Sequence, residues 1–184
     1  MGRERTDQEL VCEECRDPGR EAYERGVIPL DVVRCDRCWN RLANELAEID
    51  DATDPPRPEP DPDDVGWIEP AGCPRCGMEV RTMPTNYDRW VNLSIVPARA
   101  KEVPRRYWWR VVTLPARHSA HPVAKIAVRV SGFESLPDDV VIPAHTAECQ
   151  HPAAMAKVEE AWRADRARQS WLPPSVEEFD DEEP

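Results

Sequence analysis

The chain has 184 residues, of which 40% are apolar and 20 are prolines, and its formal net charge at pH 7 is −12. No apolar run approaches the roughly 20 residues of a membrane-spanning helix, and the N-terminal residues lack the apolar core of a signal peptide. These features predict a cytoplasmic protein whose thin apolar core needs further stabilisation, for example by bound metal.

The cysteine pattern favours metal binding over disulfides. Of the seven cysteines, six form three C-x-x-C pairs, which is the spacing of metal-binding knuckles, and the total is odd. A reducing compartment would keep such thiols free for metal. The pairs are Cys12 with Cys15, Cys35 with Cys38, and Cys73 with Cys76, and the remaining cysteine is Cys149.

Residues 1–49 form the first predicted domain. The spacing C-x2-C-x19-C-x2-C fits a structural zinc site with four thiolate ligands. Residues 27–33 have a strand-like composition, and the stretch after Cys38 has helical periodicity. This order resembles a treble-clef zinc finger. The apolar residues of the predicted helix are Trp39, Leu42, Ala43, Leu46 and Ile49.

The charge is unevenly distributed along the chain. Residues 50–70 combine aspartates with prolines, which predicts an extended acidic linker. Residues 71–130 carry 11 basic and three acidic side chains, and residues 177–184 carry six acidic ones. We therefore expect a basic central domain and a disordered acidic tail at 173–184.

Residues 71–152 form the second predicted domain. Apolar and polar residues alternate near 90–96, 107–114 and 123–130, and prolines separate these segments. This pattern predicts a small antiparallel sheet in a zinc-ribbon-like domain. A helix follows in 153–172, with Met155, Val158 and Trp162 as its apolar stripe. The predicted fold class is α+β, built from small metal-stabilised domains.

The Cys73/Cys76 pair needs two more ligands for a second zinc ion. His145 and Cys149 have a common ligand spacing and use the one unpaired cysteine, so we favour them. His118 and His121 are the alternative, which would give a site of two cysteines and two histidines.

Residues 71–152 also resemble a family of small uncharacterised actinobacterial proteins, a domain of unknown function. The resemblance rests on Cys73-Pro74-x-Cys76-Gly77, Arg89-Trp90-Val91-x-Leu93, Val103-Pro104 with Trp108-Trp109, and Ile142-Pro143-x-His145-x3-Cys149. It implies that His145 and Cys149 complete the site of the knuckle. It implies no activity.

The motifs do not predict an enzyme. Four good ligands for each ion indicate closed structural sites, and the zinc-deaminase, zinc-protease and phosphate-loop signatures are absent from the sequence. The basic central segment could be a solvated or self-paired face, could bind an acidic protein, or could bind nucleic acid. The possible binding face comprises Arg89, Trp90, Arg105, Arg106, Trp108 and Arg110.

The sequence therefore predicts a non-enzymatic adaptor or regulator that holds two structural zinc ions and acts through contacts with a protein partner. The alternative is a nucleic-acid-binding regulator that uses the basic sheet of residues 81–130, with the acidic tail as an internal competitor. No contact with a membrane is expected.

Overall fold

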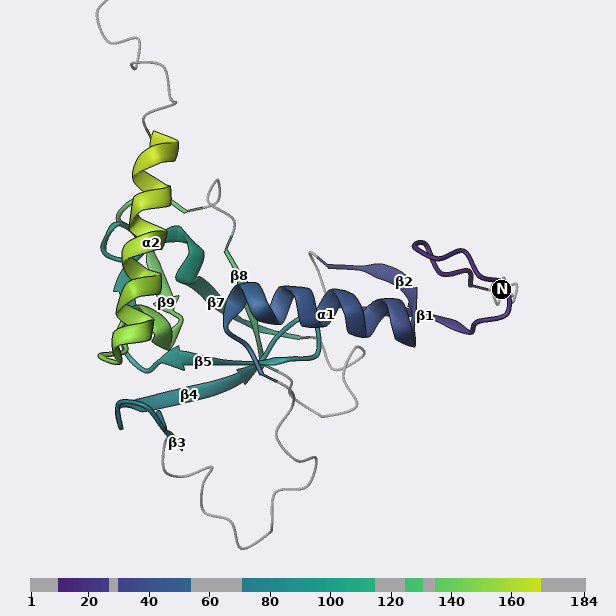
Figure 1. The fold of residues 1–184 in the computed structure, drawn as a ribbon, viewed down its shortest axis with the longest axis horizontal. Coiled ribbons are helices and arrows are strands. Elements are labelled where there is room, and N and C mark those ends of the chain that lie inside the picture. Colours follow the sequence, from purple (N-terminus) through teal and green to yellow (C-terminus); the bar gives the residue numbers. More distant parts are fainter. Residues whose placement is uncertain (1–9, 27–29, 54–70, 115–124, 131–134, 170–184) are drawn as a thin grey trace, which may run out of the picture.

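The computed structural model describes residues 10–26, 30–53, 71–114, 125–130 and 135–169. These residues form two long helices, several short 3-10 turns and antiparallel sheets (Figure 1), which confirms the predicted mixture of helices and antiparallel sheets. Most of the predicted linker and all of the acidic tail lie outside the described residues. The helices are α1 (Asp36–Asp50) and α2 (Pro152–Gln169), and the turns are η2 (Ala100–Glu102), η3 (Arg105–Tyr107) and η5 (His145–Ala147).

The strands form three sheets with the orders β1-β2, β3-β4-β5 and β6-β9-β7-β8. An isolated bridge between Leu93 and Ala144 connects β5 to the residue before η5, and another between Thr85 and Ala127 connects the end of β4 to β8. The second and third sheets are therefore linked. The strands are β1 (Ala22–Arg25), β2 (Val32–Cys35), β3 (Ala71–Gly72), β4 (Glu79–Pro84), β5 (Trp90–Ser94), β6 (Ala98–Arg99), β7 (Trp108–Thr113), β8 (Lys125–Arg129) and β9 (Val140–Pro143).

Helix α1 begins directly after β2 and three residues earlier than its apolar pattern predicted. Asp36 occupies its first turn, where a carboxylate interacts favourably with the helix dipole. The helix ends at Asp51, whose φ of 54° is left-handed. Its buried face repeats every four residues through Trp39, Ala43 and Ala47.

This buried face of α1 packs into the same hydrophobic cluster as the strands of the central sheets. The indole Nε1 of Trp39 donates a hydrogen bond to Asp88, at 2.9 Å, and the guanidinium of Arg89 donates to Asn44, at 2.7 Å. The domain boundaries in the chain stay a prediction. However, the helix of the first domain is held against the second by direct contacts and not only through residues 50–70 (Figure 1).

The C-terminal end of α1 has no basic residue of its own in its last turn, and other elements supply the positive charges. Arg106 donates a hydrogen bond to the carbonyl of Ile49, at 2.7 Å. The buried carboxylate of Asp50 accepts a hydrogen bond from the Tyr87 hydroxyl, at 2.8 Å, and forms an ion pair with Arg129, at 3.0 Å. Burial raises the pKa of Asp50, while Arg129 and the Tyr87 hydrogen bond lower it, and the net direction is upward.

We predict that Asp50→Ala lowers the free energy of unfolding by about 1.5–3 kcal/mol, because the change leaves the Tyr87 hydroxyl and the Arg129 guanidinium without their shared acceptor. The matched control is Asp138→Ala, since Asp138 forms an ion pair with Lys101 on an exposed surface and should contribute at most about 1 kcal/mol. Urea unfolding of both variants measures the difference. Equal losses would contradict the structural role given to Asp50.

Helix α2 packs through its small residues. Ala154 and Ala161 are buried, and Asp165 accepts a hydrogen bond from the backbone N–H of Arg105, at 2.8 Å. By contrast, Met155 is 58% exposed and Trp162 is only half-buried. The predicted apolar stripe therefore does not coincide with the buried side of α2, where small alanines allow close packing. Among the described residues, no helix is both long enough and apolar enough to cross a membrane.

Candidate metal centres

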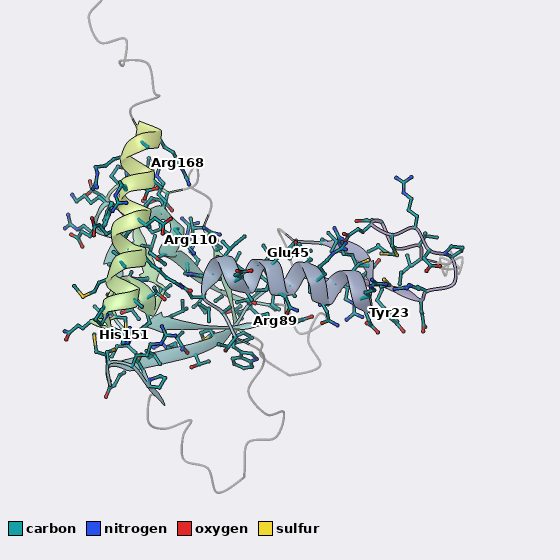
Figure 2. All side chains as sticks on the ribbon, viewed as in Figure 1. Tyr23, Glu45, Arg89, Arg110, His151 and Arg168 are labelled. Carbon is teal, nitrogen blue, oxygen red and sulfur yellow. The ribbon has the colours of Figure 1, made fainter. Side chains whose placement is uncertain are left out.

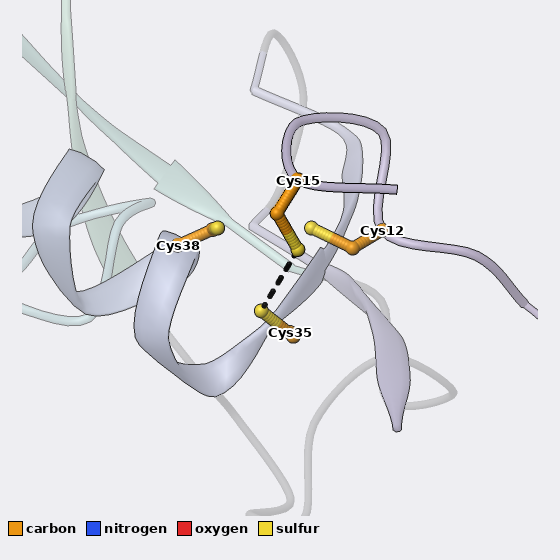
Figure 3. A group of neighbouring side chains, drawn as sticks. All are labelled: Cys12, Cys15, Cys35 and Cys38. Carbon is orange, nitrogen blue, oxygen red and sulfur yellow. Dashed lines mark hydrogen bonds between the residues drawn. The ribbon is translucent and has the colours of Figure 1, made fainter. Parts of the chain in front are cut away.

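The first candidate metal centre joins a turn near the N-terminus to the junction of β2 and α1. Cys12 and Cys15 flank the turn, Cys35 ends β2, and Cys38 lies in the first turn of α1. Figure 3 shows the four side chains converging, and their sulfur atoms all lie within 4.8 Å of one another. Because these residues come from three local elements, a bound ion would hold the whole N-terminal module together.

The sulfur separations fit a bound ion and not a disulfide. The Sγ atoms of Cys15 and Cys35 are 3.8 Å apart, whereas a disulfide bond is about 2.05 Å long. In a tetrahedral site with metal–sulfur bonds of about 2.3 Å, neighbouring sulfurs are about 3.8 Å apart. All seven cysteines are free thiols, so each can serve as a ligand.

Backbone and ionic contacts hold the turn of the first cluster in place. The N–H of Arg16 donates to the carbonyl of Cys12, at 2.9 Å, and Arg16 itself has a left-handed φ of 50°. Glu14 forms ion pairs with Arg34 of β2 and with Arg41 of α1. The sequence analysis did not single out Glu14. Its position between two candidate ligand cysteines, in a module that contains several arginines, is the signal that could have indicated its role.

The electrostatics of the first cluster favour a cation among the thiols. Hydrogen bonds from the backbone N–H groups of Cys15 and Cys35 lower the pKa of Cys12 to about 6. Burial and the neighbouring thiols raise the pKa of Cys38 to about 12. Four adjacent sulfurs cannot all ionise without a positive charge among them, and a metal ion supplies that charge.

The second candidate metal centre joins the β3–β4 hairpin to the segment between β9 and α2. It consists of Cys73, Cys76, His145 and Cys149, whose ligand atoms all lie within 4.8 Å of one another. The Nε2 atom of His145 is 3.3 Å from the Sγ of Cys76, close to the roughly 3.5 Å expected between sulfur and nitrogen ligands of one tetrahedral ion. The structure thus brings the favoured ligand set together, whereas His118 and His121 lie outside the described residues.

The knuckle of the second cluster repeats the geometry of the first. The N–H of Gly77 donates to the carbonyl of Cys73, at 2.8 Å, and Gly77 has a left-handed φ of 73°, as Arg16 does after Cys15. Glycine adopts this conformation without strain. On the opposite side, the N–H of Cys149 donates to the carbonyl of His145, at 2.9 Å, so η5 fixes the spacing of these two ligands.

Burial prepares His145 as a neutral ligand. Desolvation lowers its pKa, so the imidazole has a free ring nitrogen to offer a metal at neutral pH. Burial raises the pKa of Cys73, but hydrogen bonds from the N–H groups of Arg75 and Cys76 outweigh it, so the net direction is downward. Burial raises the pKa of Cys149. These three side chains are almost fully buried, so a metal would bind in a dry environment.

A cavity of about 450 Å³ lies beside the second cluster, between the end of α1, β5 and α2. Its walls include His145 and Cys149 from the cluster, and the charged residues Asp50, Asp51 and Lys157. The sequence analysis assigned the two aspartates to the linker, because it could not see that α1 ends against the second domain. With four protein ligands already present, a tetrahedral ion would have no open position facing this cavity.

The predicted basic face is divided between the core and the surface. Arg89 and Trp108 are buried, and the indole of Trp108 donates to the carbonyl of Val103, at 2.7 Å. These two residues were therefore wrongly placed on an exposed face. The side chains that remain at least partly accessible are those of Trp90, Arg105, Arg106 and Arg110, of which Arg110 is labelled in Figure 2.

The arginines of this face that are accessible also have partners within the protein. Arg105 lies over the Trp108 ring, at 5.9 Å from its centroid, and Arg106 binds the end of α1. Arg110 is exposed and donates a hydrogen bond to the hydroxyl of Ser135, at 3.2 Å. Part of the positive charge therefore serves the fold.

The chain matches no protein-family model, no curated protein and no solved structure at a significant level. The resemblance of residues 71–152 to an actinobacterial family stays a prediction. The two clusters of cysteine and histidine are thus the strongest functional observation, and they show two sites that could each hold a metal ion.

Proposed function

We propose that the protein is a non-enzymatic cytoplasmic adaptor or regulator, held in shape by two structural zinc ions and acting through contacts with other proteins. One observation carries the proposal: each cluster contains four ligands around one centre, which fills a tetrahedral coordination sphere. A zinc ion that activates water usually keeps one position open. Closed sites of this kind stabilise a fold. They leave no coordination position for a water molecule that the metal could activate.

The ligand sets support zinc as the metal. Tetrahedral sites of four sulfurs, or of three sulfurs and one imidazole nitrogen, suit zinc in small structural domains. The turn, hairpin and helix around the first cluster support a treble-clef-like module. The β3–β4 hairpin with ligands returning from η5 supports a zinc-ribbon-like second module. Iron in the four-thiolate site is the chemical competitor.

The surface charge supports protein partners over nucleic acid. The net charge of −12 repels polyanions at long range, and two residues of the predicted binding face, Arg89 and Trp108, are buried. The alternative, a nucleic-acid-binding regulator, is favoured by Arg110 and Lys125, which are both exposed on the β7–β8 pair. It would use the acidic tail as an internal competitor.

Nucleic-acid binding distinguishes the two candidates. Fluorescence anisotropy of labelled single- and double-stranded DNA and RNA should show no binding by the full chain or by a version that ends at Val176, across a salt series from low to physiological strength. Salt-sensitive binding that strengthens when the tail is removed, and that Arg110→Glu weakens, would overturn the adaptor proposal and establish the alternative. Arg163→Glu, a matched charge reversal on α2, controls for the change in net charge.

A further inference from the structure

Helix α2 carries a stripe of apolar and charged residues that faces away from the core. Pro152, Met155, Glu159, Trp162 and Arg166 recur at alternating steps of three and four residues, which places them along one side of the helix. Met155, Glu159 and Arg166 are exposed, and Trp162 is half-buried. Figure 2 shows α2 at one edge of the molecule, running between His151 and Arg168.

An open groove of about 840 Å³ runs beside this stripe. Residues 147–150 form one wall, and the side chains of Met155, Val158, Glu159 and Trp162 form the other. The thioether of Met155 and the indole of Trp162 lie beside this groove. Together they form a surface from which a bound partner would exclude water.

The charges on the striped side of α2 change sign at Trp162. Glu159 precedes this residue, and Arg163 and Arg166 follow it. Glu159 forms an exposed ion pair with Arg163 one turn along the same helix, at 3.0 Å, so a contact with a partner would compete with this pair. Two other charges of the helix are used within the molecule, because Lys157 pairs with Asp51 and Asp165 accepts a hydrogen bond from the backbone of η3. The outer face is therefore complementary to an antiparallel copy of itself.

We propose that this stripe is the contact surface for a second copy of the chain, with the two α2 helices packed antiparallel about a twofold axis near Trp162. The two indole rings then pack together at the centre. Because equal distances on either side of the axis face each other, Glu159 of one copy lies opposite Arg166 of the other, and this pair forms twice. The second metal centre lies close to the contact, because the groove wall formed by residues 147–150 includes its ligand Cys149.

Self-complementarity is what favours a second copy over an unrelated partner. An isologous interface needs each patch to match itself. A helix that has Glu159 before Trp162 and Arg166 after it on the same side meets that requirement when it is reversed. The net charge of −12 opposes association, but at physiological salt the Debye length is about 8 Å, so distant charges are largely screened. This inference goes beyond the proposed function and does not depend on the identity of the metal.

Sedimentation equilibrium of the full chain with both metal sites loaded tests the proposal. We expect a concentration-dependent mass that approaches twice the chain mass of 21.0 kDa, in a series that extends to roughly 100 µM at physiological salt. A measured mass that stays at that of a single chain at every concentration would overturn the proposal. This holds whether another segment of the chain or a different protein covers the stripe.

Charge reversal tests the antiparallel register without disturbing the core. Glu159→Arg and Arg166→Glu should each weaken dimerisation about tenfold or more, and the double variant should restore it. Glu160→Arg makes the same charge change on a side of α2 away from the stripe and should leave dimerisation unchanged. Trp162→Ala should weaken it roughly 30-fold or more. Failure of the double variant to recover would overturn the proposed register.

Discussion

Replacing Cys73 with serine is expected to remove one of two zinc ions and to unfold the central sheets. Cys73 belongs to the cluster of four candidate ligands that brings the β3–β4 hairpin to η5, so a metal bound there would tie the two segments together. Structural zinc contributes about 10–16 kcal/mol of apparent binding free energy, which equals or exceeds the 5–15 kcal/mol net stability of a typical domain. Native mass spectrometry would count the metal, and circular dichroism would report the loss of structure.

Histidine variants provide the matched control for this experiment. His145→Ala should also lose the second ion, while His118→Ala should keep two zinc ions per chain and the wild-type spectrum. Loss of the ion in His118→Ala but not in His145→Ala would reverse the ligand assignment. Fewer than two ions in the wild-type protein, or iron in place of zinc, would contradict the two-zinc proposal.

Ligand spacing made the metal clusters predictable from the sequence, because the C-x-x-C knuckle is a local structure. Both knuckles place a left-handed residue directly after the second cysteine, and Gly77 signalled this in advance. The pairing of Cys73 with His145 is not local. The spacing of His145 and Cys149 and the use of the one unpaired cysteine favoured it. His118 and His121 stayed open as the alternative, because the choice depends on the path of the chain between the ligands.

The strands that were not predicted from the sequence are those whose residues lack a clear alternation of apolar and polar side chains. β4 (Glu79–Pro84) has only one fully buried residue, Val80, so its alternation is weak. β9 (Val140–Pro143) is too short and too rich in proline to be recognised. In α2, periodicity identified the helix correctly but not the side that faces the core. Alanine carries little hydrophobic signal, yet close packing selects it over Met155.

The role of α1 was also hidden, because the charges around Asp50 resemble those of a solvated linker. The residue is 5% exposed and lies against Tyr87 and Arg129, far away in the sequence. No local pattern reveals that a carboxylate is paired with a distant arginine. The consequence is that the helix of the N-terminal module and the central sheets share a core, and this coupling can be measured.

Trp39→Ala is expected to lower the free energy of unfolding by about 3–5 kcal/mol, because it removes a large side chain that is only 2% exposed and leaves a cavity between α1 and the sheets. The change also leaves the Asp88 carboxylate without the indole N–H that donates to it. Urea unfolding followed by circular dichroism measures the loss. Tyr23→Ala, which removes an aromatic ring that is 42% exposed on β1, should cost less than about 1 kcal/mol.

Trp39→Phe separates packing from hydrogen bonding at this contact. It keeps an aromatic ring in the core but loses the bond to Asp88, so we expect a loss of about 1–2 kcal/mol. If α1 is coupled to the sheets, both tryptophan variants shift one common unfolding transition, and both metal ions are released at lower urea. A Trp39→Ala variant in which the first ion is released early, while the sheets and the second ion keep their wild-type midpoint, would show two independent modules. The hydrogen bonds from Trp39 to Asp88 and from Arg89 to Asn44 would then be too weak to couple them, and the shared core argues against that outcome.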